Sequence, residues 1–421
     1  MTRAQSCRAM STSALNPKRV LAELRELAAL TSDANGAQRV AWTPTWARAR
    51  DWYRGKLAEL PVAVEQDEAG NLWATLPGAS PRALIIGSHL DSVPNGGWLD
   101  GCLGVLAGLE VLRRIAGRST PPVTVRLVDW ADEEGARFGR SLFGSSAVAG
   151  RLNLEWVSRL ADADGVRLPD AVRAFGVDIA TAEQAHRQIA NAGAYLEMHI
   201  EQGPVLESLG LPLGAVIGCY GIERHQLVFS GVAAHAGGFP MHLRHDAFLV
   251  AARFALEVRE IAKRYGGVGT NGRVRNTPGV PTAVAGECAI TLDMRHIDTA
   301  RLQAMVDEAR AASTRIADEE GVAVTWRTIY QSPPQRFHPR LVDLCDEAIR
   351  EVAGASHRMP SGPGHDAIEM AWAGVPTVML FVQSLRGLSH NKDEDTRDDH
   401  LELAVRAFDR LADKVVAWLA T

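Results

Sequence analysis

The amino-acid sequence predicts an α/β protein: a mixed, mostly parallel sheet flanked by helices, interrupted by a smaller α+β domain of the split βαβ type. Between residues 61 and 130, apolar strands alternate with helical periodicity, an order typical of parallel sheets with helices on their faces. After residue 222 the pattern changes to strands and two long helices, and after residue 336 the first pattern returns. We therefore expect one α/β domain in two parts, 17–222 and 337–421, around a second domain, 223–336.

Periodicity places the individual elements of both domains. In the first part it predicts helices at 17–31, 43–60 and 102–116, a hairpin at 61–76, and strands at 83–88, 123–130 and 194–200. Residues 151–192 are expected to be helical and surface-exposed. The inserted domain has predicted strands at 225–231, 282–293 and 323–329 and helices at 246–264 and 298–318. The last part has predicted helices at 338–353, 366–373 and 398–419 and a strand at 377–382.

Composition argues against several classes of function. The net charge of −5 is spread over interspersed acids and bases, so no basic stripe is available for nucleic acid. No apolar run approaches the roughly 18 residues that cross a bilayer, and the polar residues 1–16 lack the apolar centre of a signal peptide. Five scattered cysteines without a Cys-x-x-Cys pair are typical of reduced thiols. We expect a cytoplasmic protein with a disordered tail at 1–16 and no nucleic-acid or membrane partner.

Polar side chains gather where predicted strands end. Four segments carry them: His89-Leu-Asp91 with Asp100, Asp132-Glu133-Glu134, Glu197-Met-His199-Ile-Glu201-Gln202, and Ser389-His390-Asn391. Taken alone, a histidine near an acid is usually a solvated pair or a satisfied core group. Four such segments, each after an apolar strand, favour one shared site, because α/β folds place ligands at the ends of their strands.

Imidazoles and carboxylates at strand ends suit divalent metal ions. Zn²⁺ is the first choice for such ligands, with Mn²⁺, Co²⁺ or Ni²⁺ as alternatives. Asp91, two residues after His89 in an extended segment, lies on the same side and is expected to accept the other ring N–H of His89. Glu133 and Glu134 point in different directions, so one can bind metal while the other handles protons.

Seven motifs together resemble one family. They are Gly87-Ser-His-Leu-Asp-Ser-Val-Pro-Asn-Gly-Gly, Asp100-Gly-x-x-Gly-Val, Glu133-Glu-Gly-Ala-Arg-Phe, Leu196-Glu-Met-His-Ile-Glu-Gln-Gly, Ala234-His-Ala-Gly, Ser361-Gly-x-Gly-His-Asp-Ala and Ser389-His-Asn. From about residue 18 to the end, the chain resembles the M20 metallopeptidase-like superfamily. Within it, the chain is similar to the hydantoinase/carbamoylase branch, which includes N-carbamoyl-L-amino-acid hydrolases, β-ureidopropionases and allantoate amidohydrolases.

The resemblance implies a site for two divalent metal ions that share Asp100. His89 and His199 would complete one set of ligands, and Glu134 and His390 the other. Glu133 would be the general base that takes a proton from water and later protonates the departing nitrogen. Asp91 would orient the site from behind the ligands.

The resemblance also gives the inserted domain a role as the lid and dimerisation domain of a homodimer. His235 would then reach the active site of a partner subunit and polarise the scissile carbonyl, and lid closure would exclude water. The alternative for His235 is a turn histidine that caps a strand.

The substrate-binding residues implied by the resemblance are Gln202, Arg295, Gly364 and His365. Arg295 would pair with a substrate carboxylate, unless it forms a salt bridge with an acid of its own domain. The family usually has an asparagine thirteen residues before this arginine, where this chain has Thr282. A threonine offers one hydroxyl in place of an amide donor and acceptor, which puts the usual carboxylate recognition in question.

We predict a metal-dependent amidohydrolase that cleaves a linear C–N bond in a small molecule, most specifically an N-carbamoyl-L-amino-acid hydrolase. Because of Thr282, hydrolysis of N-acyl amino acids, dipeptides or allantoate is the alternative within the enzyme class. An inactive metal-binding dimer is the alternative outside it. The presence of Glu133 and of all five expected metal ligands argues against inactivity.

Overall fold

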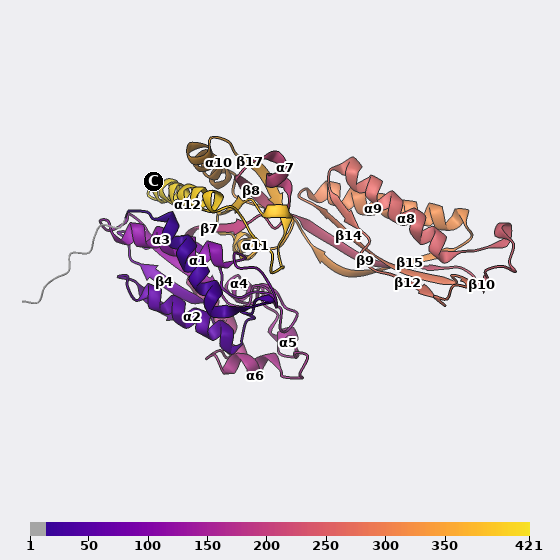
Figure 1. Ribbon diagram of the computed structural model, residues 1–421, viewed down its shortest axis with the longest axis horizontal. Coiled ribbons are helices and arrows are strands. Elements are labelled where there is room, and N and C mark those ends of the chain that lie inside the picture. Colours follow the sequence, from indigo (N-terminus) through magenta and orange to yellow (C-terminus); the bar gives the residue numbers. More distant parts are fainter. Residues whose placement is uncertain (1–13) are drawn as a thin grey trace, which may run out of the picture. The chain divides into compact units, whose positions relative to one another are not determined.

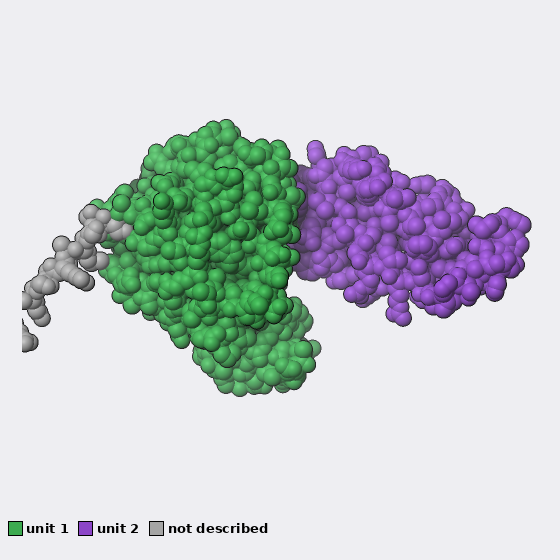
Figure 2. All heavy atoms as spheres, in the orientation of Figure 1, with its two compact units in different colours: residues 1–217, 337–421 green, residues 218–336 purple. Residues whose placement is uncertain are grey.

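The computed structural model describes residues 14–421, which form two compact units (Figure 1 and Figure 2). The larger unit contains the described residues up to Ile217 together with Phe337–Thr421, and the smaller contains Gly218–Arg336. Most of the expected N-terminal tail, residues 1–13, lies outside the described residues. Asn16, the last residue of that tail, is the N-cap of helix α1 (Pro17–Thr31), where its side chain accepts a hydrogen bond from Arg19 N.

The larger unit is built on a sheet with parallel strands at its centre, which confirms the predicted α/β class. Strands β6 (Thr124–Trp130), β5 (Ala83–His89), β7 (Ala192–Ile200) and β18 (Thr377–Val382) lie side by side and run in the same direction. Every residue of β5 and β18 is buried, as expected for parallel strands covered on both faces. Because the four strands are parallel, the residues that follow them meet at one edge of the sheet.

Further strands, most of them antiparallel to their neighbours, extend this sheet on both sides. Next to β6 lie β4 (Leu72–Leu76) and β3 (Ala63–Gln66), and next to β18 lies β8 (Leu213–Cys219), with which β16 (Gln335–Arg336) and β17 (His357–Ser361) pair. A two-stranded sheet, β1 (Ser32–Asp33) with β2 (Gly36–Ala37), precedes them.

Long helices cover the sheet. Helix α3 (Cys102–Ala116) packs on the central strands, and α10 (Pro339–Ala353) and α12 (Asp398–Leu419) pack on β18 and on each other. Helix α1 contacts α3, α12 and α2 (Pro44–Leu57). Helix α11 (Asp366–Trp372) contacts β7 and β18.

The segment 151–192 differs from the prediction of a helical, surface-exposed stretch. It forms α5 (Leu154–Val157), α6 (Leu168–Arg173) and the 3₁₀ segment η1 (Ile179–Ile189), and apolar side chains from all three are buried. Gly165 and Gly176 have positive φ and interrupt the helical course between these pieces. Three further short helices complete the unit: α4 (Phe143–Val148), α7 (Val205–Leu209) and η3 (Leu385–Gly387).

The smaller unit is an antiparallel sheet covered by two helices, as the split βαβ pattern predicts. Its strands lie in the order β11 (Val268–Thr270), β14 (Glu287–His296), β9 (Gly221–Ser230) and β15 (Ala323–Ser332), and β12 (Val274–Thr277) also pairs with β14. Helices α8 (Ala247–Tyr265) and α9 (Thr299–Glu319) pack on this sheet around a core that includes Phe229, Phe254 and Leu292. A separate pair, β10 (Ala234–His235) with β13 (Ala283–Val284), and η2 (Met241–Leu243) lie apart from it.

Within residues 14–421, the helices are all either too short or too polar to span a bilayer.

Candidate active site

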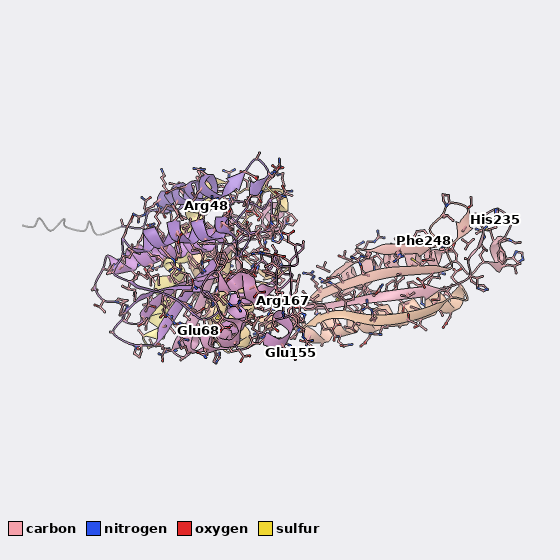
Figure 3. The ribbon with its side chains drawn as sticks, turned by 90° about the horizontal axis from the view of Figure 1, so that it is seen from below. Arg48, Glu68, Glu155, Arg167, His235 and Phe248 are labelled. Carbon is pink, nitrogen blue, oxygen red and sulfur yellow. The ribbon has the colours of Figure 1, made fainter. Side chains whose placement is uncertain are left out.

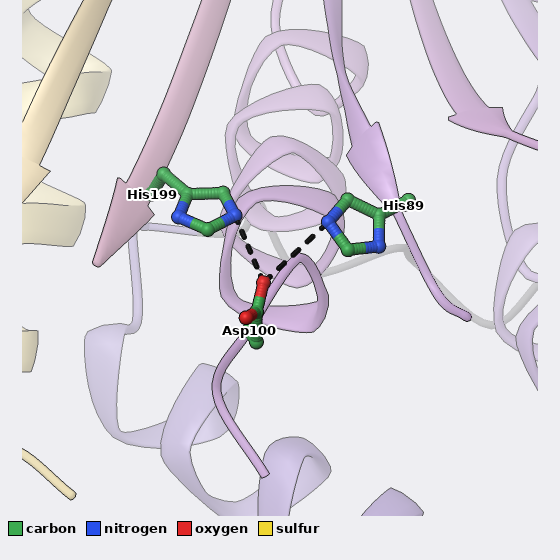
Figure 4. A group of neighbouring side chains, drawn as sticks. All are labelled: His89, Asp100 and His199. Carbon is green, nitrogen blue, oxygen red and sulfur yellow. Dashed lines mark ion pairs between the residues drawn. The ribbon is translucent and has the colours of Figure 1, made fainter. Parts of the chain in front are cut away.

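The parallel strands bring three predicted residues together at one edge of the sheet (Figure 4). His89 ends β5, His199 is the penultimate residue of β7, and Asp100 immediately precedes the turn into α3. Asp100 Oδ1 lies 3.1 Å from His199 Nε2 and 3.5 Å from His89 Nε2. All three residues are buried, and their donor atoms form a group compact enough to hold a metal ion.

A second group uses the other oxygen of the same carboxylate. His390 Nε2 lies 3.4 Å from Asp100 Oδ2 and 3.2 Å from Glu134 Oε2, and these three residues also form a group that could hold a metal. Glu134 comes from the loop after β6 and His390 from the loop after β18. Asp100 therefore stands between two sets of donors, in a geometry suited to a bridging ligand.

Hydrogen bonds at Nδ1 orient the two buried histidines. His89 Nδ1 lies 3.1 Å from the backbone oxygen of Asp91, and His199 Nδ1 lies 3.0 Å from the backbone oxygen of Ile200. A carbonyl oxygen only accepts, so in both rings Nδ1 carries a proton, and Nε2 is the nitrogen that can bind a metal. The acceptor for His89 is thus a backbone oxygen, whereas the prediction placed the Asp91 carboxylate there.

The Asp91 carboxylate has a different set of partners. Its two oxygens accept hydrogen bonds from the backbone N–H groups of Glu133, at 3.2 Å, and Glu134, at 3.1 Å. It lies 3.6 Å from His89 Nδ1, at ion-pair distance only. Asp91 therefore fixes the two glutamates through their backbone.

Burial and mutual repulsion set the electrostatics of the site. Burial raises the pKa of Glu133 well above its usual value, and burial also raises the pKa of Glu134. For Asp100, burial is outweighed by the adjacent imidazoles of His199 and His89, which hold its pKa well below the usual range. The hydrogen bond with Glu134 raises the pKa of His390 to about 9. Crowded carboxylates and histidines of this kind gain from a bound cation.

Two unsatisfied atoms indicate that this donor set fits a divalent metal. His199 Nε2 and Glu134 Oε1 are buried and have no hydrogen-bond partner among residues 14–421. A buried lone pair without a partner is costly unless it binds a cation. Imidazole nitrogens with carboxylate oxygens are the ligands typical of Zn²⁺ and of neighbouring transition metals.

Backbone strain is concentrated in the same region. Asp132, Gln202 and His390 have φ of 57°, 57° and 53°, in the left-handed region that residues other than glycine rarely occupy. Such conformations cost on the order of 1 kcal/mol each and are typical of functional sites.

Glu133 and His365 lie within this cluster. Glu133 is 7% exposed, and its Oε2 lies 3.7 Å from His89 Nε2. The His365 ring packs 4.5 Å from that of His199, measured between centroids, and its Nε2 lies 3.0 Å from Ser361 Oγ. Glu197, His199 and His365 form a third group of metal-competent donors, which shares His199 with the first. Gly364, next to His365, is exposed.

Gln202 lies directly against Asp100. Its Nε2 donates to Asp100 Oδ2 at 2.9 Å and to Ser389 Oγ at 3.0 Å. Its Oε1 is buried and lacks a partner in the part of the chain that the structure describes. Gln202 can therefore accept one N–H from a molecule bound at the site.

Sequence reasoning missed Glu394, which also belongs to this site. Its carboxylate accepts from the backbone N–H groups of Leu99 and Asp100 and from Ser389 Oγ. Glu394 lies between exposed acids in Lys392-Asp-Glu-Asp, a pattern that is usually a solvated surface. Only its spacing of four residues from His390 could have drawn attention to it.

In the smaller unit, the structure separates the predicted lid residues. His235 is exposed at one end of this unit (Figure 3), in register with Ala283, and Thr282 is also exposed there. Ser230, five residues before His235, pairs with Glu287 at the start of β14. Arg295 lies eight residues further along that strand, roughly 27 Å at the usual strand rise. Within one smaller unit, His235 and Arg295 therefore cannot contact the same small molecule.

The contacts of these residues bear on their expected roles. His235 Nδ1 accepts from the backbone N–H groups of Gly237, at 3.2 Å, and Gly238, at 3.1 Å, so its Nε2 carries a proton and is a hydrogen-bond donor. Arg295 Nε donates to Asp293 Oδ1 at 2.7 Å, the salt bridge considered as the alternative to substrate binding.

Comparisons with known proteins agree with this geometry. Residues 85–414 match the model of peptidase family M20/M25/M40. The chain is 34% identical to an N-carbamoyl-L-amino-acid amidohydrolase of Paenarthrobacter aurescens, over 91% of this chain and 94% of that protein. It is 33% identical to the allantoate amidohydrolase of Escherichia coli, over 89% and 91%. A crystal structure of a hydantoinase/carbamoylase family amidase from Burkholderia multivorans superposes with a TM-score of 0.87 at 30% identity, over 95% of this chain and 98% of that one.

These matches confirm the resemblance drawn from the seven motifs, and the matched span contains every residue of the two donor groups around Asp100. The chain therefore belongs to peptidase family M20/M25/M40 and, within it, to the hydantoinase/carbamoylase branch of metal-dependent amidohydrolases.

Proposed function

We propose that this protein is an N-carbamoyl-L-amino-acid hydrolase, which converts an N-carbamoyl amino acid and water into the amino acid, carbon dioxide and ammonia. The observation that carries the proposal is the Asp100 carboxylate, whose two oxygens face two separate groups of metal-competent side chains. The names of several relatives support the choice of substrate class.

His89, Asp100 and His199 would hold one cation, and Asp100, Glu134 and His390 the other. We propose Zn²⁺, with Mn²⁺, Co²⁺ or Ni²⁺ as alternatives, on the strength of the mixed nitrogen and oxygen donors. When bound, the two ions would supply Lewis acidity and lower the pKa of water.

Glu133 is the proposed general base. It belongs to neither group around Asp100, and its Oε2 lies 3.7 Å from His89 Nε2. Burial raises the pKa of Glu133, which suits a group that takes and returns a proton near neutral pH. It would take a proton from the attacking water and then protonate the departing nitrogen. Asp91 holds the backbone of Glu133 in place for this exchange.

Gln202 is proposed to recognise the substrate through its amide oxygen. That oxygen is buried without a partner within the described range, so it can accept a ureido N–H, while the Gln202 amide N–H groups are already engaged with Asp100 and Ser389. His365 and Gly364 are proposed to line the same region.

A homodimer is proposed because one chain cannot use both His235 and Arg295 on one substrate. In this arrangement His235 of one subunit donates from Nε2 to the scissile carbonyl in the other. Phe248, Leu249 and Leu256 on helix α8 are exposed, and Val268 on edge strand β11 is exposed as well. An exposed apolar helix face beside a strand edge that is unpaired within residues 14–421 suits pairing with a second copy.

A cytoplasmic location is proposed from cysteine chemistry. Cys102, Cys288 and Cys345 are buried free thiols, as expected for a protein of a reducing compartment.

Allantoate is the second candidate substrate. Thr282 stands where carbamoylases usually have an asparagine. In addition, the chain is about as similar to the allantoate amidohydrolase of Escherichia coli as to the carbamoylase of Paenarthrobacter aurescens. N-acyl amino acids and dipeptides are the remaining candidate substrates.

A substrate panel tests the proposal. The protein reconstituted with Zn²⁺ or Mn²⁺ is assayed for ammonia and amine release from N-carbamoyl-L-amino acids, their D-enantiomers, allantoate, N-acetyl amino acids and dipeptides. We expect the highest kcat/KM for an N-carbamoyl-L-amino acid. Preference for allantoate or an N-acyl substrate would replace this assignment, and a protein that binds metal but turns over no member of the panel would support the inactive dimer.

A further inference from the structure

Glu394 makes an unusual set of contacts for a residue in an acidic surface stretch. Its side chain is 2% exposed, whereas its neighbours Asp393 and Asp395 are exposed. Oε1 accepts from the backbone N–H groups of Leu99, at 3.1 Å, and Asp100, at 3.0 Å. One buried oxygen of Glu394 thus accepts from two backbone N–H groups, one of which belongs to Asp100 itself.

The second oxygen of Glu394 reaches the other ligand-bearing loop. Oε2 accepts from Ser389 Oγ at 3.0 Å, and Ser389 directly precedes His390. The same hydroxyl lies 3.0 Å from Asp100 Oδ2. Since a hydroxyl has one proton, Ser389 donates to one carboxylate at a time while it accepts from Gln202 Nε2.

The contact is closely packed from the opposite side. A Cβ added to Gly97 would lie 2.0 Å from Glu394 Oε1 and 2.5 Å from Glu394 Cβ. The loop before Asp100 can approach Glu394 only because residue 97 has no side chain. Gly97 therefore provides the space in which the Glu394 carboxylate lies between the two loops.

We propose that Glu394 is a positioning residue, which ties the loop of Asp100 to the loop of His390 and so holds the shared carboxylate between its two groups of donors. The inference rests on the proposed two-metal function. It concerns geometry alone: Glu394 contacts the backbone of one candidate ligand and the residue before another, and it acts on the metals through them.

Removing this side chain would leave the Leu99 and Asp100 N–H groups buried without an acceptor and would release the two loops from each other. Outer residues that orient metal ligands typically contribute about 10- to 100-fold to metal affinity. Glutamine at this position keeps an oxygen for the two N–H groups and a hydrogen bond to Ser389, with the donor reversed. A geometric role therefore predicts that E394Q rescues what E394A loses.

The test measures metal affinity of the full-length protein without substrate. Metal-free wild type, E394A, E394Q and the control D393A are titrated with Zn²⁺ against a chromogenic chelator and with Co²⁺ by its visible absorption. Asp393 is the adjacent, exposed acid, so D393A matches E394A in charge and in place on the loop. We expect about a 10-fold or greater loss of affinity and an altered Co²⁺ spectrum in E394A, with E394Q and D393A within about threefold of wild type.

Wild-type affinity in E394A would overturn the inference, and so would equal losses in E394A and E394Q, because charge and not position would then be the cause. If circular dichroism shows that E394A does not fold, S389A takes its place, and the expectation is at least about a threefold loss of Co²⁺ affinity. Wild-type affinity in S389A would then be contradictory. A wild-type protein that binds no Zn²⁺ would instead overturn the proposed function, which separates the two failures.

Discussion

Asp100 concentrates the chemistry of the site at the scale of a single residue. One oxygen faces His89 and His199, and the other faces His390 and accepts from Gln202. Its partners come from three different strands or the loops after them, β5, β7 and β18, yet each lies within hydrogen-bond or ion-pair reach. A single carboxylate can therefore belong to both candidate metal groups, and the residues around it can be given separate roles.

The role of Glu133 is tested by an isosteric change. Glu133→Gln keeps the shape of the side chain and removes its ability to take a proton, so kcat should fall by about 100-fold or more with Zn²⁺ content unchanged. Turnover and bound metal are measured on the same sample. The matched control is Glu155→Gln, a change at an exposed glutamate of the same unit that should leave both readings at the wild-type level. A Glu133→Gln variant with wild-type turnover would remove Glu133 from the mechanism.

At this scale the sequence predicted the residues that follow apolar strands and missed those that hold them. His89, Glu133, Glu134 and His199 stand in or directly after strands, where a buried polar side chain needs a special reason. Glu394 lies among exposed acids, and the structure alone shows that it is buried. The acceptor for His89 was also misassigned, because alternation along a strand gives the side of a residue but not the choice between its carboxylate and its backbone oxygen.

Among the elements, the start of helix α3 depends on a residue without a side chain. Gly101 has φ of 65°, and a Cβ there would lie 2.4 Å from the His89 ring. Gly101→Ala should displace the ring and lower Zn²⁺ affinity by about 10-fold or more, read by chelator competition. Gly55→Ala in helix α2 is the control, since nothing lies within 4 Å of the added Cβ. Equal affinity in the two variants would show that α3 can begin without this glycine.

Helices α1 and α3 are joined by a buried ion-pair network. The Glu110 side chain is fully buried and accepts from Arg19 Nε at 2.7 Å, while Arg113 pairs with Glu23 at 2.7 Å. Glu110→Ala would leave the arginines without this partner, and we expect a loss of about 3 kcal/mol in the free energy of unfolding, measured with urea on metal-free protein. Asp170→Ala, which removes an exposed pair with Arg173, should change it little. A small effect of Glu110→Ala would mean that water replaces the carboxylate.

Elements with strong periodicity were predicted almost to the residue. The predicted helices 17–31, 102–116 and 398–419 coincide with α1, α3 and α12. The structure of residues 151–192 was not predicted correctly. Glycines divide this stretch into helical pieces that are too short to be recognised by their periodicity. Short strands such as β11, β12 and β16 were missed as well, since pairing with a neighbour defines them more than their own residues do.

At the scale of the whole molecule, the central prediction is that His235 acts in the partner subunit. Heterodimers are isolated after co-expression of differently tagged H235A and E133Q chains. If His235 acts in trans, one of the two sites receives both intact residues, and activity should be about half that of wild type. If His235 acts within its own chain, neither site is complete and the heterodimer should be as inactive as either homodimer.

The division into two units could be expected from the change of pattern along the chain. The positions of His235 and Arg295 within the smaller unit could not. Strand and helix periodicity reports which faces are buried within one chain. The separation of His235 from Arg295 appears only once the register of β14 is known. If both residues act on one substrate, as we propose, they must come from different subunits.

The most direct test of the account is a metal titration of the metal-free enzyme. Protein stripped with a chelator is titrated with Zn²⁺ while ammonia release from an N-carbamoyl-L-amino acid is followed. We expect no activity without metal and a rise that levels off at about two equivalents per chain, because two groups of donors around Asp100 would each hold one ion. Full activity in the stripped protein, or a plateau at one equivalent, would contradict it.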